Sequence, residues 1–551
     1  MRFDTEHTPL ALGVLFLALA LVGIGAADIT GEDEAREVGI VQDVLAGHWL
    51  WPRFNAELIP DKPVLSHWLG ALPCAIAGFS ETAVRLPSAV AGATLVAWTA
   101  RFGMHALGAG PGIAAGLLLA TTPAFFSRVR LARPDVLMLC CLAPALGLVF
   151  RAWREGRARD ASWALALLGL ATFAKGPVAP ALFLTTLLGF LAWQRELRRL
   201  PAFFPLPGLV AFAILGLGWY AVALAGWGDE FVRQHILGRY VHNLAGGVVE
   251  GQEYSPDSLL FHVTFYPKHL FAVALPWTPL VVAALIRLHR RGGFANPLVR
   301  FLICWAVAPV VVFTPAAWKL RYYLLPSLPA LALLAGPLAA ELVTWPIGRL
   351  RATRASLAAG ALAIAVGGTA IWVALARPDL LSRSDQTTLA NFLSVVPGRT
   401  GTAALVAGTL LGMAAAAIAL RLWGPLVALT GSLAVGWFAV GAPSVAAAVP
   451  SAVSLRRFAH DAQERFPAPG ELAFWGLTIR SVVVYAGRPI PTLDRDESRI
   501  TPGLGVIATS AAYERLAAAG LVGARLVVGE GQVGNLERGT LVLAVGRPPT
   551  P

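Results

Sequence analysis

Charged side chains are rare along most of this chain, so the few places where they gather are the candidates for chemistry. The first is the segment 31–62, which begins GEDEAR and ends with Lys62 ahead of Pro63. A carboxylate such as Asp33, with Glu34 beside it, can deprotonate a hydroxyl, position an acceptor or bind a divalent cation. The same acids would also stabilise the start of a helix without any chemical role. An ammonium such as that of Lys62 suits a phosphate.

Further charges lie at the ends of apolar stretches or inside them, where an ionisable residue is costly and therefore a functional candidate. Asp135 follows an Arg-Pro pair, where it could cap a helix or serve as a second acid facing Asp33. Lys175 precedes a Gly-Pro pair inside an apolar block, and a buried lysine there needs an anion or backbone carbonyls. Arg85 fits a phosphate-binding role and a headgroup-level cation equally well. The other candidates beside these charges are Arg36, Arg133, Arg239, Lys319, Tyr322 and Tyr323.

Three histidines, His235, His242 and His269, fall in or near a second charged loop. They lack the HxxxH or HExxH spacing of a tight zinc site, so a chance grouping is favoured over metal binding. A divalent metal ion stays open as a cofactor, but none is required by the pattern. Walker and dinucleotide glycine motifs are absent, which argues against direct use of ATP. The four cysteines lie in apolar stretches and indicate no disulfide framework.

The composition is that of an integral membrane protein. Hydrophobic residues make up 56% of the 551 residues and charged residues only 14%, whereas soluble domains have about a quarter charged residues. The net charge of +12 could indicate nucleic acid, but the arginines cluster in short gaps between apolar runs, as in cytoplasmic loops. We therefore expect membrane lipids, and no nucleic acid, as surroundings.

About 20 apolar residues are needed to cross a bilayer. The block 162–193 is too long for one span, so we expect two short helices that meet at Lys175-Gly176-Pro177. The stretch 64–79 is short and is expected to lie at the membrane surface. With the block counted twice, thirteen spans are predicted. The other predicted spans are 10–27, 83–100, 111–127, 135–150, 206–226, 271–286, 298–314, 322–340, 356–375, 401–420 and 425–443.

The basic clusters orient these spans. If the arginine-rich segments 151–159, 195–199, 287–291 and 349–354 are cytoplasmic, the N-terminus is cytoplasmic and the C-terminus external. The external loops are then 28–82 and 227–270. With this orientation, Asp33, Lys62, Asp135, Lys175, Arg239 and Lys319 all fall on the external side.

The composition changes near residue 443. Short β-rich runs, LAFWG, SVVVYAG, GVIATS, ARLVVGEG and TLVLAVG, surround a helical segment, AAYERLAAAG. The predicted fold is an α-helical polytopic membrane domain, 1–443, followed by a small external α/β domain, 444–551.

Six motifs follow one another in order within residues 10–345: GEDEAR, DKPVLSHW, ETAVRLPSAVAG, ARPD, FAKGP and RYYLLPSLPALALLAG. This series resembles the GT-C membrane glycosyltransferases of the protein-O-mannosyltransferase type, and among them the bacterial lipid A aminoarabinose transferases. The thirteen spans and the external C-terminal domain agree with that family.

The resemblance implies a multi-pass protein of the bacterial inner membrane that takes a sugar from an undecaprenyl-phosphate-linked donor on the periplasmic side. The implied reaction is transfer of 4-amino-4-deoxy-L-arabinose to a lipid A phosphate. The matching residues imply Asp33 and Asp135 as the two acids, Lys62, Lys175 and Arg239 as charged residues of the cavity, and Tyr322 in the cavity. Glu34 could share the catalytic role of Asp33, and we expect Lys62, Arg85, Lys175 and Arg239 on the donor phosphate. Of these, Lys62 and Arg239 would stabilise the leaving phosphate, and Asp33 would orient or deprotonate the acceptor.

Other functions remain open at this point. The same donor class could serve a protein, glycan or other envelope acceptor, since a shared fold does not decide among them. A lipid or sugar transporter would also use broken helices and charges, but it would usually show internal repeats, which we do not find. An envelope-binding protein whose C-terminal domain is the active part is a third reading.

Overall fold

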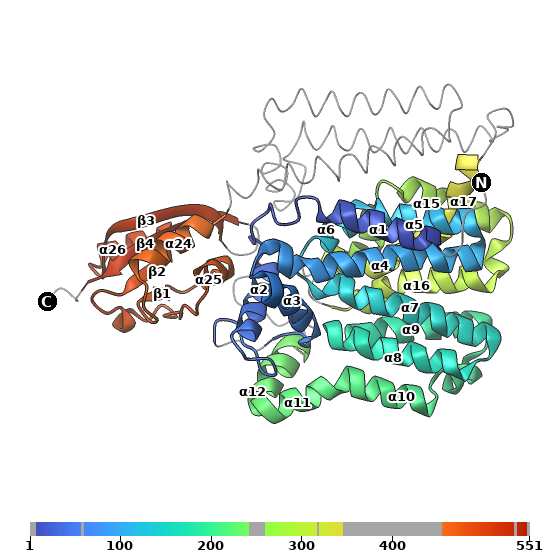
Figure 1. Ribbon diagram of the computed structural model, residues 1–551, viewed down its shortest axis with the longest axis horizontal. Coiled ribbons are helices and arrows are strands. Elements are labelled where there is room, and N and C mark those ends of the chain that lie inside the picture. Colours follow the sequence, from blue (N-terminus) through green and yellow to red (C-terminus); the bar gives the residue numbers. More distant parts are fainter. Residues whose placement is uncertain are drawn as a thin grey trace, which may run out of the picture.

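A computed structural model describes residues 7–56, 60–241, 259–316, 319–344, 454–533 and 537–547. A bundle of apolar helices carries the charged first loop at one end, next to a small domain that contains the sheet (Figure 1). The predicted spans 356–375, 401–420 and 425–443, and the predicted domain boundary at 443, lie outside the described residues.

The bundle is built from helices that pack in pairs along most of their length. Its hydrophobic core contains large side chains such as Phe301 and Trp305 together with many alanines, which let the helices approach closely. The helices are α1 (His7–Leu21), α4 (Glu81–Leu107), α5 (Ala109–Ala120), α6 (Pro123–Val129), α7 (Pro134–Glu155), α8 (Ala158–Lys175), α9 (Val178–Gln194), α10 (Leu206–Phe212), α11 (Gly218–Trp227), α14 (Leu259–Val273), α15 (Thr278–Arg290), α16 (Pro297–Phe313) and α17 (Leu328–Thr344).

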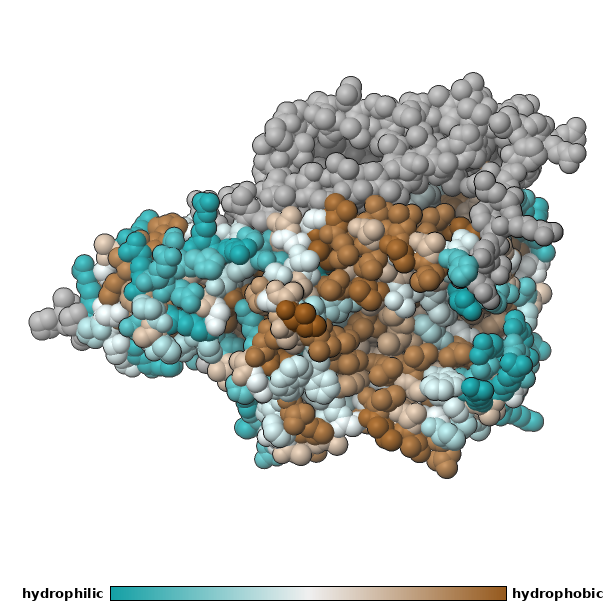
Figure 2. Space-filling model, viewed as in Figure 1, coloured by the Kyte–Doolittle hydropathy of each residue, from teal (hydrophilic) through white to brown (hydrophobic). Residues whose placement is uncertain are grey.

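The surface of this bundle suits a bilayer. Figure 2 shows a hydrophobic band over the helices, with hydrophilic surface at the far end and over the C-terminal domain. Within the described residues, three helices are long and apolar enough to cross a membrane, or five if each of two bent pairs forms one span. The predicted total of thirteen spans therefore stays a prediction.

Several predicted helices are broken by their own sequence. The expected break at Lys175 is confirmed: α8 ends there and Gly176 takes a φ of +91°, which favours glycine. The predicted span 111–127 is bent by 66° between α5 and α6. The predicted span 271–286 is also bent, because the chain turns by 104° between α14 and α15, where Pro276 cannot continue a helical hydrogen-bond ladder.

Two helices of the first external segment cover the same end of the bundle (Figure 1). Helix α2 (Glu32–Leu45) begins with three acidic residues, which the helix dipole favours. Helix α3 (Leu65–Ala77) has 13 residues and is shorter than a spanning helix, in keeping with the expected surface helix. Short elements of the second loop follow: α12 (Asp229–Phe231) and the π-helix η3 (Val232–Val241).

The C-terminal domain has the predicted mixture of helices and strands. Its four-stranded sheet has the order β1-β2-β4-β3, with β1 parallel to β2 and the other pairs antiparallel. Its helix α26 (Ser510–Ala518) is the predicted helical segment. Its other elements are α24 (Arg456–Arg465), β1 (Leu472–Phe474), α25 (Arg480–Ala486), β2 (Gly505–Thr509), β3 (Val522–Val533) and β4 (Glu537–Gly546).

One run in this domain was predicted wrongly. SVVVYAG, expected as a strand, forms helix α25, in which every residue from Ser481 to Ala486 is buried. The valine-rich run has strand propensity, but burial on all sides overrides that weak local preference. Gly487, with a φ of +63°, ends the helix in the usual left-handed conformation.

Candidate active site

Asp33 lies in the first turn of α2 and is linked to two other elements of the bundle. Its Oδ2 accepts hydrogen bonds from Arg133 Nη2 at 3.0 Å and from the Tyr322 hydroxyl at 3.2 Å. Its Oδ1 faces Arg36 Nη2 at 3.8 Å. Burial would raise the pKa of Asp33, but the charges of Arg133 and Arg36 hold it below its usual range. A carboxylate with a lowered pKa is a weak base, so this geometry suits orientation better than proton abstraction.

A second buried carboxylate, Glu37, lies one turn further along α2. Its Oε1 accepts from Lys62 Nζ at 2.5 Å and from Arg36 Nη2 at 3.2 Å, and its Oε2 contacts His67 Nε2 at 2.8 Å. Burial would raise the pKa of Glu37, but Lys62, His67 and Arg36 hold it well below its usual range. Arg36 also pairs with Asp61 at 2.9 Å. Glu37 thus fixes Lys62, the predicted phosphate ligand, in the site.

The second predicted acid, Asp135, lies in the first turn of α7. Its Oδ1 contacts Lys175 Nζ at 2.6 Å, and its Oδ2 lies 3.5 Å from Arg133 Nε. Lys175 also lies 5.5 Å from the ring centre of Tyr323. The helix break after Lys175 therefore places its ammonium against the acid, as expected for a lysine in an apolar block. A small cavity here is lined by Asp135, Met138, Lys175, Val178, Phe313, Tyr322, Tyr323, Leu325 and Pro326.

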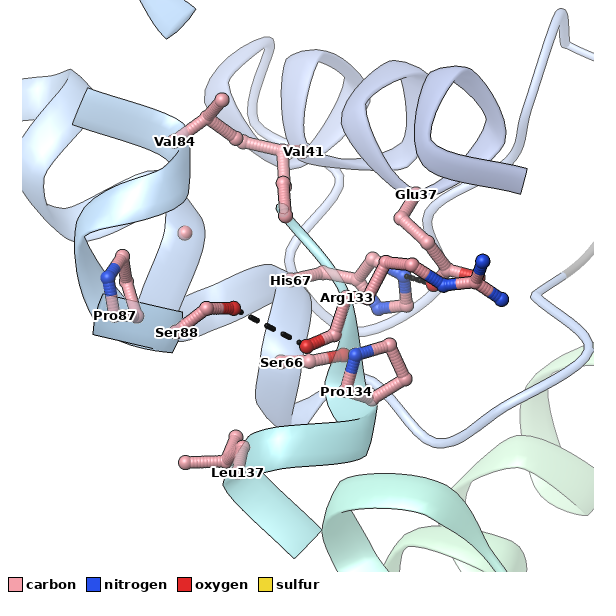
Figure 3. Close-up of a pocket in the computed structure, with 12 residues that line it drawn as sticks. Glu37, Val41, Ser66, His67, Val84, Pro87, Ser88, Arg133, Pro134 and Leu137 are labelled. Atoms are coloured by element: carbon pink, nitrogen blue, oxygen red, sulfur yellow. Dashed lines mark hydrogen bonds and ion pairs between the residues drawn. The ribbon is translucent and has the colours of Figure 1, made fainter. Parts of the chain in front are cut away.

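A neighbouring cavity lies behind Arg133, between α2, α3, α4 and the start of α7 (Figure 3). His67 and Glu37 meet on one side of it, and the Ser88 hydroxyl donates to the Arg133 carbonyl at 3.2 Å. The Nδ1 of His67 and the hydroxyl of Ser66 are buried here and have no hydrogen-bond partner among the described residues. Polar groups of this kind leave the cavity suited to water, which would satisfy them.

Arg128, at the end of α6, is a cation that the sequence analysis missed. Its guanidinium carbon lies 4.2 Å from the ring centre of Tyr322, and the guanidinium carbon of Arg133 lies 4.7 Å from the same ring centre. Among the described residues, the guanidinium of Arg128 forms neither a hydrogen bond nor an ion pair, although the residue is partly buried. A partly buried guanidinium that lacks an acceptor is suited to bind an anion.

Two of the predicted site residues are paired with each other away from this cluster. Glu34 contacts Arg85 Nε at 2.8 Å and Nη2 at 3.1 Å, and it also accepts from Ala132 N at 2.9 Å. Arg85 further donates to the carbonyls of Ile24 and Ala27 at 2.9 and 2.6 Å. Both side chains are buried. This pair links the segment that follows α1 to α2 and α4, which is a positioning arrangement.

The remaining candidates lie around the periphery. Lys319 donates to the carbonyls of Phe313 and Thr314 at the end of α16, so its ammonium caps that helix. His235 contacts the Pro60 carbonyl at 2.8 Å, and His269 contacts that of Phe265 at 2.7 Å. The side chain of Arg239 and all of His242 lie outside the described residues. The part of the chain that the structure describes contains no group of three or more His, Cys, Asp or Glu residues arranged for a metal ion.

The cluster around Asp33 has a clear chemical bias. Its cations are Arg36, Lys62, Arg128, Arg133 and Lys175, and its acids are Asp33, Glu37, Asp61 and Asp135. A partly buried site with excess positive charge, two small cavities and a guanidinium that has no acceptor in the described ranges can bind a phosphate and stabilise charge that develops on it.

Part of this network could not be predicted from the sequence. Glu37 and His67 lie on helices as ordinary polar residues, and only the packing of α2 against α3 brings them together. A spacing argument would have helped for Glu37, since it lies four residues after Asp33 and therefore on the same helical face.

Comparisons with known proteins agree with this fold. Residues 61–219 match the family of dolichyl-phosphate-mannose-protein mannosyltransferases. Two curated relatives carry the name undecaprenyl phosphate-alpha-4-amino-4-deoxy-L-arabinose arabinosyl transferase. The protein from Shewanella sediminis is 26% identical over 331 residues, 58% of each chain. That from Pseudomonas paraeruginosa is 30% identical over 312 residues, 55% of this chain and 54% of the relative. The chain thus spans less than two thirds of the length of the curated relatives it matches.

A solved structure extends the likeness to nearly the whole chain. The crystal structure of ArnT from Cupriavidus metallidurans bound to undecaprenyl phosphate aligns with a TM-score of 0.72, at 19% identity and with 97% of both chains covered. The apolar helices and this fold identify a multi-pass membrane protein. The resemblance expected from the six motifs is confirmed: this chain is similar to the GT-C glycosyltransferases of the mannosyltransferase family, and it has the fold of the aminoarabinose transferase ArnT.

Proposed function

We propose that this protein transfers a sugar from a polyprenyl-phosphate donor to an envelope acceptor, and that the reaction is transfer of 4-amino-4-deoxy-L-arabinose to a lipid A phosphate. The observation that carries the proposal is the cationic cluster around Asp33, in a fold shared with a protein solved with undecaprenyl phosphate. The names of the curated relatives support the same sugar and lipid carrier.

The donor phosphate gains charge during the reaction. A polyprenyl-phosphate sugar carries one negative charge on its phosphodiester; when the bond between the anomeric carbon and the phosphate oxygen breaks, the leaving phosphate takes the electron pair. Lys62, Lys175 and Arg128, the donor subsite of this proposal, supply cations where that charge develops. Preorganised groups of this kind typically contribute on the order of 10²–10³ in rate each. Arg239 would join them from the second loop.

The acceptor chemistry follows from Asp33. An ionised phosphate oxygen attacks the anomeric carbon directly and has no proton to lose, so no general base is needed. A protein or glycan hydroxyl would need one, and the lowered pKa of Asp33 makes it a poor base. This favours a phosphate acceptor over a hydroxyl acceptor. Asp33 and Asp135 would instead orient the sugar and hold the surrounding cations, while Glu34 and Arg85 would support α2.

The proposal includes the predicted topology. The N-terminus would be cytoplasmic and the C-terminal domain periplasmic, with the site at the periplasmic end of the helices. The grouping of α2, α3 and the C-terminal domain at one end of the bundle supports this arrangement (Figure 1). No step is assigned to a metal ion.

The test is transfer in membranes of a bacterial host that makes the aminoarabinose donor but lacks its own transferase. Mass spectrometry of lipid A would compare the wild type with Asp33→Ala and Lys62→Ala. Matched controls are Asp461→Ala and Lys268→Ala, which change exposed residues of the same types away from the site. We expect an aminoarabinose adduct with the wild type and both controls, and its loss in both site variants. Unmodified lipid A, despite folded wild-type protein and available donor, would refute the lipid A acceptor.

A further inference from the structure

The C-terminal domain is attached to the helix that carries Asp33. Helices α25 and α2 pack against each other, and Gln42 Nε2 donates to the Val484 carbonyl at 3.0 Å. Side chains from both helices share one buried hydrophobic core, which includes Val38, Val41 and Val483. The domain is therefore part of the framework of the site.

Hydrogen bonds also hold this domain to the segments on either side of α2. Before the helix, Ile29 N donates to the Tyr485 hydroxyl at 2.6 Å. After the helix, Asn55 and Ile490 exchange two hydrogen bonds of 2.8 and 2.7 Å. Because both flanks are anchored, the position of α25 relative to the first turn of α2 is well defined.

Arg480, the first residue of α25, lies over that first turn. Its Nη1 donates to the Glu32 carbonyl at 3.4 Å, and its Nε lies 3.6 Å from Glu32 Oε2. Both distances are long for charge-assisted contacts, which are typically about 2.7–2.9 Å. The side chain is 28% exposed, so an incoming group can reach it. Arg480 is thus a cation without a close acceptor in the described part of the chain.

The surroundings of Arg480 favour an anion. Burial and the nearby charge of Arg36 lower the pKa of Arg480. Burial raises the pKa of Glu32 to about 7, so at neutral pH this acid balances Arg480 only in part. One further donor, Nε of Arg36, is buried and has no hydrogen-bond partner within the part of the chain that the structure describes. An anion placed here would offset the repulsion between the two guanidinium groups.

Asp33 faces Arg36 with one carboxylate oxygen, and with the other it faces Tyr322, whose ring lies against Arg128 of the donor subsite. Its Oδ2 faces Arg133 and Tyr322, whereas its Oδ1 faces Arg36. Transfer of a sugar from one phosphate to another with inversion requires the two phosphates on opposite sides of the anomeric carbon. Arg36 and Arg128 lie on different sides of this carboxylate, which matches that requirement, while Lys62 shares Glu37 with Arg36.

We propose that Arg480, assisted by Arg36, forms a second anion subsite that binds the phosphate of the acceptor and is contributed by the C-terminal domain. This inference rests on the proposed function. The acceptor phosphate oxygen would form its bond to the anomeric carbon here, while the bond to the donor phosphate breaks on the other side of the sugar.

Steady-state kinetics of the full-length protein would test the assignment. The variants are Arg480→Ala and Arg480→Lys, and the control is Arg525→Ala, an exposed arginine of the same domain that pairs with Glu514. We expect Arg480→Ala to raise KM for lipid A about tenfold, the effect of one lost charge-assisted hydrogen bond, with KM for the donor within about twofold. Arg480→Lys should recover part of the loss, and the control should match the wild type.

Other outcomes would overturn the assignment. An increase in the donor KM instead would place Arg480 on the donor phosphate. An unchanged KM for both substrates would remove Arg480 from binding. If Arg480→Ala and Arg480→Lys lost activity equally and both had a lower Tm, the role of Arg480 would be structural.

A binding measurement separates this inference from the proposed reaction. Thermal shift of the purified protein would be recorded with lipid A, with dephosphorylated lipid A and with undecaprenyl phosphate. We expect Arg480→Ala to lose the shift caused by phosphorylated lipid A and to keep that caused by undecaprenyl phosphate. We expect the same shifts even if the wild type transfers no sugar. The absence of sugar transfer would refute the proposed function but not the acceptor subsite. A wild-type shift that is the same with and without the lipid A phosphates would overturn the subsite.

Discussion

The buried contact between Lys62 and Glu37 allows the structural and chemical roles of the lysine to be separated. Glu37 is 3% exposed and receives three groups: Lys62 at 2.5 Å, His67 at 2.8 Å and Arg36 at 3.2 Å. Breaking a buried ion pair by removing one partner typically costs about 3–5 kcal/mol. Since two of the three groups remain in Lys62→Met, we expect a smaller loss of about 2 kcal/mol in the free energy of unfolding.

The double variant Lys62→Met/Glu37→Gln removes both charges. Its stability should return to within about 1 kcal/mol of the wild type, because no uncompensated carboxylate remains in the interior. Its activity should not return, because the phosphate has lost its lysine; we expect rates lower on the order of 10²-fold, as for other groups that stabilise developing charge. Glu37→Gln alone keeps the lysine and should retain most activity.

Two measurements on the same purified samples decide this. Thermal unfolding in detergent reports stability, and the initial rate of sugar transfer reports activity. If the double variant regained both stability and rate, Lys62 would act only by neutralising Glu37, and the phosphate role would be refuted. If Lys62→Met were as stable as the wild type, the reasoning from the buried ion pair would be wrong.

Three further predictions concern other charges. Arg85→Met should lower Tm, because it leaves Glu34 buried without its cation. Its activity should fall only as far as the amount of folded protein falls. A higher KM for the donor at an unchanged Tm would contradict this prediction. Arg128→Ala should raise the donor KM on the order of tenfold without lowering Tm, since the Arg128 side chain has no described hydrogen bond to lose. A donor KM equal to that of the wild type would contradict this prediction. Burial raises the pKa of Glu32 from 4.5 to about 7, so the folded state binds more protons and wild-type stability falls as pH rises through that range, by up to about 3 kcal/mol. The Tm of Glu32→Gln relative to that of the wild type should therefore increase from pH 5 to pH 8, whereas the relative Tm of the exposed control Glu497→Gln should not. A difference in Tm between Glu32→Gln and the wild type that does not change with pH would contradict this prediction.

Much of the fold could be predicted from the composition and from the residues that interrupt helices. The apolar runs predicted the helices of the bundle, and the Gly-Pro pair after Lys175 predicted the break between α8 and α9. The Thr-Thr-Pro bend at 121–123 and the turn at Pro276 were missed, because a hydropathy window averages over a local bend. Helix α25 was missed because burial on all sides outweighs the strand preference of its valines.

The site could be predicted only in outline. Charge in an apolar setting correctly indicated that Lys175 would need an anion or backbone carbonyls, and its partner is Asp135. Adjacent acids were harder to tell apart: Asp33 and Glu34 are neighbours in sequence, but successive helical residues point about 100° apart. One therefore meets Arg133 and the other Arg85. Such partners are set by helix packing and leave no local signal.

The most direct test of the central claim, that the cationic cluster binds a polyprenyl phosphate, compares that lipid with its uncharged alcohol. Binding of undecaprenyl phosphate and of undecaprenol to the purified protein would be measured by native mass spectrometry, for the wild type, Lys62→Ala, Lys175→Ala and the exposed control Lys268→Ala. The account predicts saturable binding of the phosphate over the alcohol in the wild type and the control, weakened at least about tenfold in both site variants. Equal binding of the two lipids by the wild type, or full binding by both site variants, would contradict it.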